Sequence, residues 1–380
     1  MRLLKRAYNS RALLLCLMIS AIVLSGLSAC SSFPSGATSG LPPVTIKEFI
    51  TPTVNSGPTT IVKGPDGNLW FTEFQANQIG RITPKGAITE FPLPTQHSQP
   101  DLIIVGPDSN LWFTGMASAN ALGRITPAGV ITTYPVNSPT DIVAGPDGNI
   151  WFTTLNQIGR ITPAGVITEF SLPSLQSNPL SLVVGPDKNL WFTVGSQFSR
   201  DKVGRITTSG EITEFPAPNA DIAVGPDGNL WLAVTNAIWR MTPKGATTKF
   251  PLSSIDSTPG NIITGPDGNM WFLDSSIDSL GRMTSSIGRV TLRGVITEYA
   301  LPALNNSPFL LITGPDDTLW FLEGGSPNDI GQIGRVTLKG VTTVFQTPSP
   351  YSFPMDITVG PDGALWFTES TSYAIGRITP

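Results

Sequence analysis

Carboxylates recur at one position of a repeated sequence unit, three residues after a tryptophan, and they are the side chains best suited to chemistry. The acids at this position are Glu73, Asp274, Glu323 and Glu369. Carboxylate oxygens are the ligands that Mg²⁺ and Ca²⁺ prefer in proteins. We therefore predict an acidic rim that binds a divalent cation or a polar ligand, with Glu323 and Glu369 as the candidate metal ligands.

A second column of acids lies near the start of another segment of the unit, at Asp141, Asp221 and Asp356. We expect that segment to be the innermost of its unit, so these carboxylates would approach a central channel beside the first column. The alternative for all seven acids is that they pair with arginines of the repeat or face solvent. Only if the acids form the predicted rim would the chain hold a cofactor, and that cofactor would be Mg²⁺ or Ca²⁺.

Histidine occurs once, as His97, in the polar stretch 94–100. A single imidazole excludes a zinc site built on several histidines. It also leaves Ser-His-Asp chemistry open only if His97 is itself the base. A lone histidine in a polar loop is usually solvated, and contact with a ligand is the alternative.

The acids sit in a unit that is repeated eight times. Each unit contains Gly-Pro-Asp, then an apolar residue and tryptophan, then Ile-Gly-Arg or a variant, and last a segment such as Ile-Thr-Glu-Phe. The spacing between units is about 40 residues, and the tryptophans are Trp70, Trp112, Trp151, Trp191, Trp231, Trp271, Trp320 and Trp366. The short β-branched and aromatic segments, separated by Gly, Pro, Asp and Asn, indicate four strands per unit. This period predicts an all-β fold, a β-propeller of four-stranded blades.

The two ends of the repeat region are complementary. The chain stops at 375–380, after a third strand, whereas residues 44–49 resemble a fourth strand and precede the first Gly-Pro-Asp. We therefore predict that strand 44–49 closes the last blade and that the propeller spans 44–380 with eight blades. Seven blades are the alternative. Blade six is then the irregular one, because it carries two third-strand signals, at Arg282 and Arg289.

Alternation of strand direction sorts the connections onto two faces. The turns between strands one and two and between three and four are nearly uniform in sequence. The connections between strands two and three, and from each blade to the next, vary; we call the side that carries them the variable face. Variable loops on a rigid scaffold are where sites are built. We expect this face to bind an unknown small molecule, glycan or protein.

The net charge and the N-terminal residues bear on partners and location. Acidic residues outnumber basic ones by 27 to 23, which offers no basic surface for nucleic acid. Residues 1–29 combine a basic head with an apolar run ending in Leu-Ser-Ala before Cys30, which is typical of a lipoprotein signal peptide. We predict a lipid on Cys30, a flexible tether over 30–43, and a monomer held at the cell membrane, outside the cytoplasm. The alternatives are an ordinary signal peptide and an uncleaved anchor.

The unit at 64–94, GPDGNLWFTEFQANQIGRITPKGAITEFPLP, resembles the virginiamycin B lyase family, and the resemblance covers 44–380. NHL and SMP-30-like propellers share parts of the signature. The resemblance implies a β-propeller, seven-bladed in the lyase, that opens cyclic streptogramins by magnesium-assisted elimination. It also implies a catalytic histidine just after the proline that opens strand one, and glutamates that hold the metal.

This chain keeps glutamates at the ends of three second strands, as Glu73, Glu323 and Glu369, but departs from the pattern at every position that matches the histidine. The residues there are Thr59, Asp101, Thr140, Leu180, Ala220, Gly260, Phe309 and Met355. None is histidine, so the primary hypothesis is a surface propeller that binds a ligand or protein without catalysis. Two enzymatic alternatives stay open: a metal-dependent carbon–oxygen lyase that relies on carboxylates, and an SMP-30-like lactonase or hydrolase.

Overall fold

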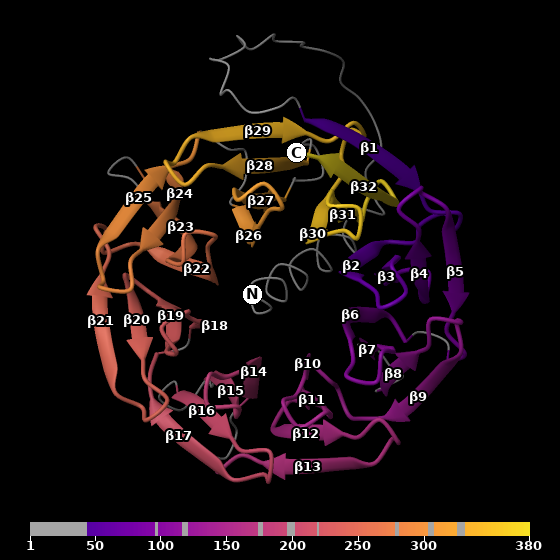
Figure 1. Ribbon diagram of the computed structural model, residues 1–380, viewed down its shortest axis with the longest axis horizontal. Helices are drawn as coiled ribbons and strands as arrows, with labels where there is room; N and C mark the ends of the chain where they lie inside the picture. Colours follow the sequence, from indigo (N-terminus) through magenta and orange to yellow (C-terminus); the bar gives the residue numbers. More distant parts are fainter. Residues whose placement is uncertain are drawn as a thin grey trace.

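Eight four-stranded antiparallel sheets surround a central axis in the computed structural model (Figure 1). The structure describes residues 44–95, 98–115, 121–173, 178–195, 202–218, 220–277, 281–302, 308–324 and 331–380. The predicted eight-bladed propeller is confirmed, and the seven-bladed alternative is excluded. The predicted signal peptide 1–29, Cys30, the predicted tether and His97 lie outside the described residues.

The strands follow the repeat, four to a blade. Those of blades one to four are β2(Pro58–Lys63), β3(Leu69–Glu73), β4(Gln78–Ile82), β5(Ile88–Pro92); β6(Pro100–Val105), β7(Leu111–Gly115), β8(Ala121–Ile125), β9(Ile131–Pro135); β10(Asp141–Ala144), β11(Ile150–Thr153), β12(Gln157–Ile161), β13(Ile167–Ser171); β14(Asn178–Val184), β15(Leu190–Gly195), β16(Lys202–Ile206) and β17(Ile212–Pro216). Those of blades five to eight are β18(Asp221–Val224), β19(Leu230–Val234), β20(Ala237–Met241), β21(Thr247–Pro251); β22(Thr258–Thr264), β23(Met270–Ile277), β24(Met283–Val290), β25(Ile296–Ala300); β26(Pro308–Thr313), β27(Leu319–Glu323), β28(Gln332–Val336), β29(Thr342–Gln346); β30(Pro354–Val359), β31(Leu365–Glu369), β32(Ala374–Thr379) and, closing the ring, β1(Thr45–Ile50).

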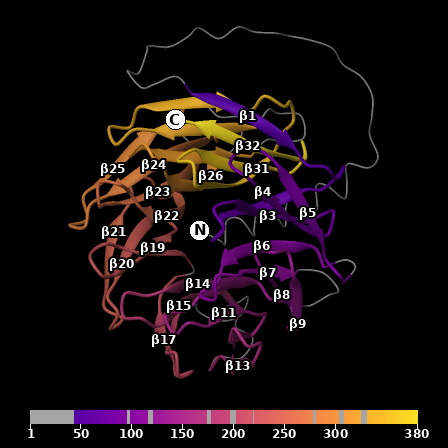
Figure 2. The same ribbon diagram turned by 45° about the vertical axis from the view of Figure 1, so that its right-hand side comes forward.

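Ring closure joins the two ends of the propeller. Strand β1 pairs antiparallel with β32, in a register that runs from Thr45 opposite Thr379 to Ile50 opposite Ala374. The two strands lie side by side in both views (Figures 1 and 2). The predicted fourth strand of blade eight is therefore confirmed, at residues 45–50.

One set of contacts, repeated in every blade, explains the motif residues. In blade one the indole Nε1 of Trp70 donates a hydrogen bond to Asp66 Oδ1 at 3.0 Å, and the ring stacks on Phe91 at 5.4 Å. Arg81 lies over the Trp70 ring and donates from Nη1 to the backbone oxygen of Pro127 in blade two at 3.0 Å. The Gly-Pro-Asp turn, the tryptophan and the arginine thus hold each blade together, and in blades one to five the arginine also ties its blade to the next one.

The glycine of Ile-Gly-Arg makes room for an aromatic ring. A Cβ on Gly80 would lie 2.1 Å from the Phe71 ring, which sits across from it on β3. Blade five reverses this pairing, because Leu232 stands where the other blades have phenylalanine and Trp239 stands opposite in place of glycine. The smaller aliphatic side chain leaves space for the indole, so the volume between the blades stays filled.

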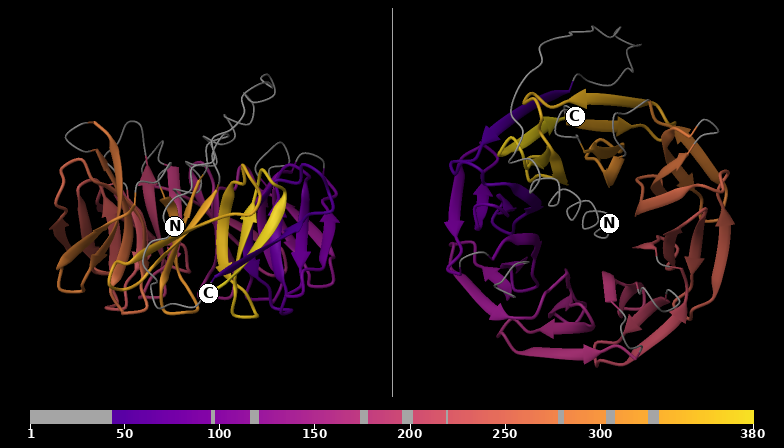
Figure 3. Two further views of the ribbon diagram at one scale, coloured as in Figure 1. Left: turned by 90° about the horizontal axis from the view of Figure 1, so that it is seen from above. Right: turned by 180° about the vertical axis from the view of Figure 1, so that it is seen from behind.

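The two faces differ as the sequence predicted. In side view the C-terminal end of the chain marks the face of the uniform turns (Figure 3). On the opposite, variable face, β23 and β24 of blade six each run to eight residues, with Ile277 paired to Met283. Arg289 is the third-strand arginine of this blade, since it pairs with Asp267 at 2.6 Å. In the described part of the chain no helix has the length and apolar character needed to span a membrane.

Candidate functional site

The four acids at the ends of the second strands lie inside the protein. Glu73 and Glu369 have no exposed surface, while Glu323 and Asp274 are 2% and 4% exposed. They belong to different blades, and among the described residues no three histidine, cysteine or acidic side chains form a group that could hold a metal. These acids therefore do not form a shared, solvent-facing cluster.

In blade one, Glu73 faces a second carboxylate. The register of β3, β4 and β5 projects Glu73 and Glu90 from the same face of the sheet, toward blade eight. Glu90 accepts two hydrogen bonds from Thr53, one from the backbone nitrogen at 2.9 Å and one from Oγ1 at 2.7 Å. Thr53 belongs to the connecting segment 51–57, which folds over the end of β3. Through these hydrogen bonds Glu90 holds the segment 51–57 in place over Glu73.

The chemistry of Glu73 follows from this enclosure. Neither oxygen of its carboxylate makes a hydrogen bond of good geometry in the described chain, although Ser56 and Glu90 lie close enough to affect its pKa. Burial, together with the negative charge of Glu90, raises the pKa of Glu73 to about 8. A buried acid next to another acid is stabilised in its neutral form. Without a countercharge, Glu73 is therefore mostly protonated at neutral pH.

Blade eight repeats the arrangement across the ring closure. Glu369 ends β31, and Glu48 lies on the closing strand β1. Glu48 accepts hydrogen bonds from the Ser349 backbone nitrogen at 2.9 Å and from its Oγ at 2.6 Å. Burial and the charge of Glu48 raise the pKa of Glu369 to about 8, although Ser372 donates to its Oε2 at 3.2 Å. Its other oxygen, Oε1, has no partner among the described residues.

Blade six has a weaker form of the same pair. Asp274 accepts a hydrogen bond from Ser257 Oγ at 2.9 Å, which satisfies one of its oxygens. Burial raises the pKa of Asp274 to about 6; the hydrogen bond from Ser257 opposes this rise and the charge of Glu298 adds to it. Glu298 in turn accepts a hydrogen bond from Ser253.

The second column of acids joins neighbouring blades. Asp141 accepts hydrogen bonds from the backbone nitrogens of Ile142 and, in blade four, of Leu182, both at 2.8 Å. Asp356 accepts one from Ile61 in blade one at 2.9 Å. Asp221 accepts one from Ile222 at 3.1 Å. Asp141 and Asp356 therefore act as ties between the inner strands.

The arginines of the repeat pair with a different set of acids. Arg81 lies 4.0 Å from Asp66, Arg377 lies 2.7 Å from Asp362, and the other arginine pairs recorded for this motif also involve the Gly-Pro-Asp aspartates. These arginines thus pair with the turn aspartates of their own blades.

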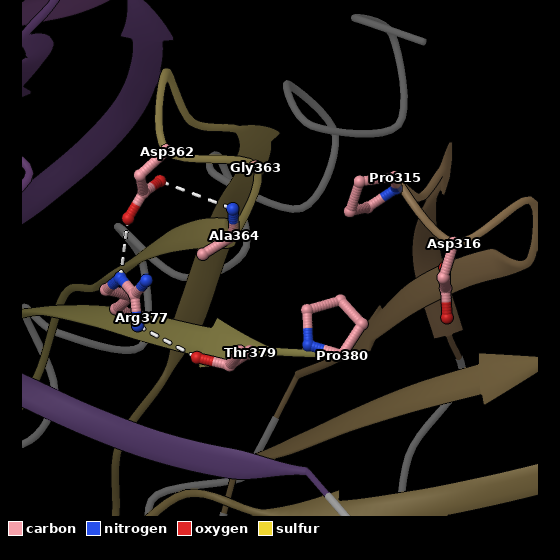
Figure 4. Close-up of a pocket in the computed structure, with 8 residues that line it drawn as sticks. All are labelled: Pro315, Asp316, Asp362, Gly363, Ala364, Arg377, Thr379 and Pro380. Carbon is pink, nitrogen blue, oxygen red and sulfur yellow. Dashed lines mark hydrogen bonds and ion pairs between the residues drawn. The ribbon is translucent and has the colours of Figure 1, made fainter. Parts of the chain in front are cut away.

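A small cavity of about 240 Å³ lies between the turns of blades seven and eight, on the face opposite the variable face (Figure 4). Its lining includes Asp316, Asp362 and Arg377. Arg377 Nε donates to Asp362 Oδ2 at 2.7 Å, and Nη1 donates to Thr379 Oγ1 at 2.8 Å. Arg377 pairs with Asp362, and Asp316 lies 3.8 Å from Arg335, so these charges belong to the scaffold contacts.

A family-wide comparison accounts for the repeated unit. The sequence model of the virginiamycin B lyase family matches residues 44–141, 137–286 and 284–380, which is the whole propeller. This chain belongs to the virginiamycin B lyase family.

Two solved structures of virginiamycin B lyase-like proteins resemble the chain along its length. A streptogramin B lyase is 32% identical, with 88% of this chain and 97% of that chain covered and a TM-score of 0.60. A catalytically inactive virginiamycin B lyase from Staphylococcus aureus, with one histidine replaced by alanine and solved with quinupristin, is 31% identical. The match covers 89% of this chain and all of that one, with a TM-score of 0.61.

The catalytic centre that the virginiamycin B lyase resemblance implies does not fit the residues of this chain. In blade eight the position of the implied histidine holds Met355, which is 6% exposed, next to the proline that pairs with Glu369. Glu369 and Glu323 are buried in separate blades rather than gathered around a shared point. We derive no metal-assisted step from this arrangement.

Sequence reasoning missed the partners of the buried acids. Glu48, Glu90, Thr53 and Ser349 were not singled out, although a signal was present. The segments 51–58 and 347–354 share the pattern Thr-Pro-Ser/Thr, two variable residues, Ser, one variable residue and Pro. These two segments precede two of the blades whose second strand ends in glutamate.

Proposed function

We propose that this protein is a ligand- or protein-binding member of the virginiamycin B lyase family that does not open streptogramin rings. The observation that carries the proposal is the residue at the implied catalytic position. It is the buried Met355 in blade eight, and none of the seven equivalent positions holds histidine. A thioether is neither a proton acceptor at neutral pH nor a ligand that Mg²⁺ prefers.

The relatives support the same inference. Replacement of one histidine by alanine accompanies loss of catalysis in the S. aureus lyase. This chain has a single histidine, His97, in a connection between blades. A base that contributes about 10²–10⁴-fold to a rate would therefore have to come from a carboxylate or from His97.

We place the binding surface on the variable face. In its described part, the segments that lead into blades one, six and eight expose Val54, Ile255 and Tyr351, the first two by more than three quarters of their surface. Apolar side chains at the tips of connections on a rigid ring suit contact with another molecule. A lipid on Cys30 would hold this face outside the cytoplasm near a membrane.

A thermal-shift screen tests the binding role. The full chain, purified in detergent, is screened against glycans, peptides and small molecules, among them a type B streptogramin. We expect a ligand to raise the melting temperature of the wild type and of Val166→Ala, a control on the opposite face. The shift should shrink in Tyr351→Ala. A ligand whose shift is unchanged in Tyr351→Ala and Ile255→Ala but lost in Val166→Ala would place binding elsewhere and contradict the proposal.

The lyase alternative is favoured by family membership and by the glutamates at 323 and 369. It predicts magnesium-dependent opening of the streptogramin ring by this chain. Our proposal predicts binding at most, without ring opening.

A further inference from the structure

Two blades contain the same enclosed pair of carboxylates, which we call the paired-carboxylate sites. One consists of Glu73 and Glu90 in blade one, and the other of Glu369 and Glu48 in blade eight. In both, the second-strand glutamate is fully buried and has at least one oxygen without a partner among the described residues. In both, the fourth-strand glutamate accepts two hydrogen bonds from the segment that leads into the blade, 51–57 in blade one and 347–353 in blade eight. We call these two the covering segments.

The covering segments also share their conformation. The fifth residue of each has a positive φ, 58° at Asn55 and 60° at Tyr351, which is uncommon for residues other than glycine. The first and sixth residues join their hydroxyls: Thr51 Oγ1 lies 2.7 Å from Ser56 Oγ, and Thr347 and Ser352 repeat the contact. The same turn thus covers the same pair of acids in both blades.

Among the described residues, those that act on the two buried glutamates are acidic or hydroxyl side chains, and none is basic. The charged neighbour that acts on Glu73 is Glu90, and the one that acts on Glu369 is Glu48, so like charges face each other in a dry interior. Removing such charges from water is unfavourable unless a countercharge is present. Serine hydroxyls supply further oxygen atoms close by, from Ser56 in blade one and Ser352 and Ser372 in blade eight.

We propose that each paired-carboxylate site binds one Ca²⁺, held by the two carboxylates and neighbouring hydroxyl oxygens. Ca²⁺ accepts six to eight oxygen ligands in irregular geometry, whereas Mg²⁺ demands a near-ideal octahedron and keeps several waters. A closed site with two carboxylates and several hydroxyls therefore suits Ca²⁺ better. Its double charge matches the two carboxylates.

These sites differ from the catalytic metal centre implied by the family, because each lies within one blade under its own covering segment. Their role would be structural. In blade eight Ca²⁺ would connect Glu369 to Glu48 on the closing strand, and in blade one it would fasten the segment 51–57. The inference does not depend on the proposed binding function.

Calcium titration tests the proposal. The full chain in detergent is stripped with a chelator and titrated with CaCl₂ by calorimetry. We expect one equivalent per paired-carboxylate site, the loss of one equivalent in Glu73→Gln, and the loss of both in the double variant with Glu369→Gln. Glu169→Gln is the control and should bind like the wild type, because this fourth-strand glutamate is exposed and the second strand of its blade is followed by Thr154 instead of an acid.

Melting temperatures provide a second readout on the same samples. Saturating Ca²⁺ should raise the melting temperature of the wild type and of Glu169→Gln, and should leave that of the double variant unchanged. Absence of calcium binding by the stripped wild type would overturn the proposal, whatever the folding of the variants. Equal binding by the wild type and a folded double variant would overturn it as well.

Discussion

Glu48 and Ser349 are 301 positions apart in the sequence, yet two hydrogen bonds join them, at 2.9 Å and 2.6 Å. Glu48 lies on the closing strand, and Ser349 lies in the segment that enters blade eight. The strand that completes the ring is therefore held along its backbone by β32 and through its side chain by the covering segment.

Deletion of 44–49 tests this closure. Without β1, strand β32 becomes an exposed edge, and the backbone groups that paired with β1 lose their partners. We expect a sharply lower melting temperature and a tendency to aggregate, measured by circular dichroism and light scattering. Deletion of 34–39 in the predicted tether is the control and should leave the melting temperature unchanged. An intact melting temperature in the first deletion would refute the closure.

The acceptor for the tryptophan in each blade offers a second prediction. Asp147 accepts hydrogen bonds from Trp151 Nε1 at 3.0 Å and from Asn149 Nδ2 at 2.8 Å. Asp147→Ala leaves the buried indole donor without its partner, which should lower the free energy of unfolding by about 1–3 kcal/mol. Urea denaturation measures the change. Asp256→Ala, at an exposed position, should have almost no effect, and equal effects of both substitutions would contradict the assigned role.

Stability should fall as the pH rises in chelator. The pKa values of Glu73 and Glu369 in the folded state are about 8, above the ordinary value of 4.5. Between these two pKa values the folded protein therefore holds more protons than the unfolded chain. Each unit of pKa difference contributes about 1.4 kcal/mol to the free energy of unfolding. The contribution of each glutamate to the free energy of unfolding is fully present below pH 4.5, and it is lost progressively as the pH rises to about 8.

The variant Glu73→Gln isolates one of these groups. Glutamine cannot ionise, so the variant should lose less stability than the wild type between pH 5 and pH 8.5. Urea denaturation at several pH values, with chelator present, provides the comparison. Parallel pH profiles for the two proteins would show that Glu73 ionises as freely in the folded state as in the unfolded chain.

The architecture could be read from the sequence because the repeat encodes it locally. Turn residues, the tryptophan and the arginine occupy fixed offsets, and their contacts form within a blade or with the next one. The position of Glu73 could not be read in this way. Glu73 is buried because the backbone nitrogens of Phe74 and Gln75 donate hydrogen bonds to the backbone oxygens of Gly57 and Ser56. These bonds bring the covering segment over the end of the strand.

The same reasoning applies to the inner aspartates. Their column was recognised, but a column does not say whether a side chain points into the channel or toward the next blade. Asp141 points to Leu182 in blade four because a backbone nitrogen there needs an acceptor. A hydrogen bond between two blades cannot be predicted from the residue spacing within one unit.

Processing at Cys30 remains a prediction that mass spectrometry can check. We expect a mature N-terminus at Cys30 that carries lipid, and a chain that partitions with membranes. Cys30→Ser should abolish the lipid and leave the propeller folded. An unmodified N-terminal peptide that begins at another residue would contradict the lipoprotein assignment.

Turnover of a type B streptogramin tests the central claim most directly. The full chain in detergent is incubated with the antibiotic, with and without Mg²⁺, beside the S. aureus lyase as a positive control. Because elimination leaves the mass unchanged, the linear isomer is separated from the cyclic parent by liquid chromatography. We predict that the parent stays cyclic in the presence of this chain while the control converts it. Magnesium-dependent opening by this chain, abolished in Glu369→Gln, would contradict the account.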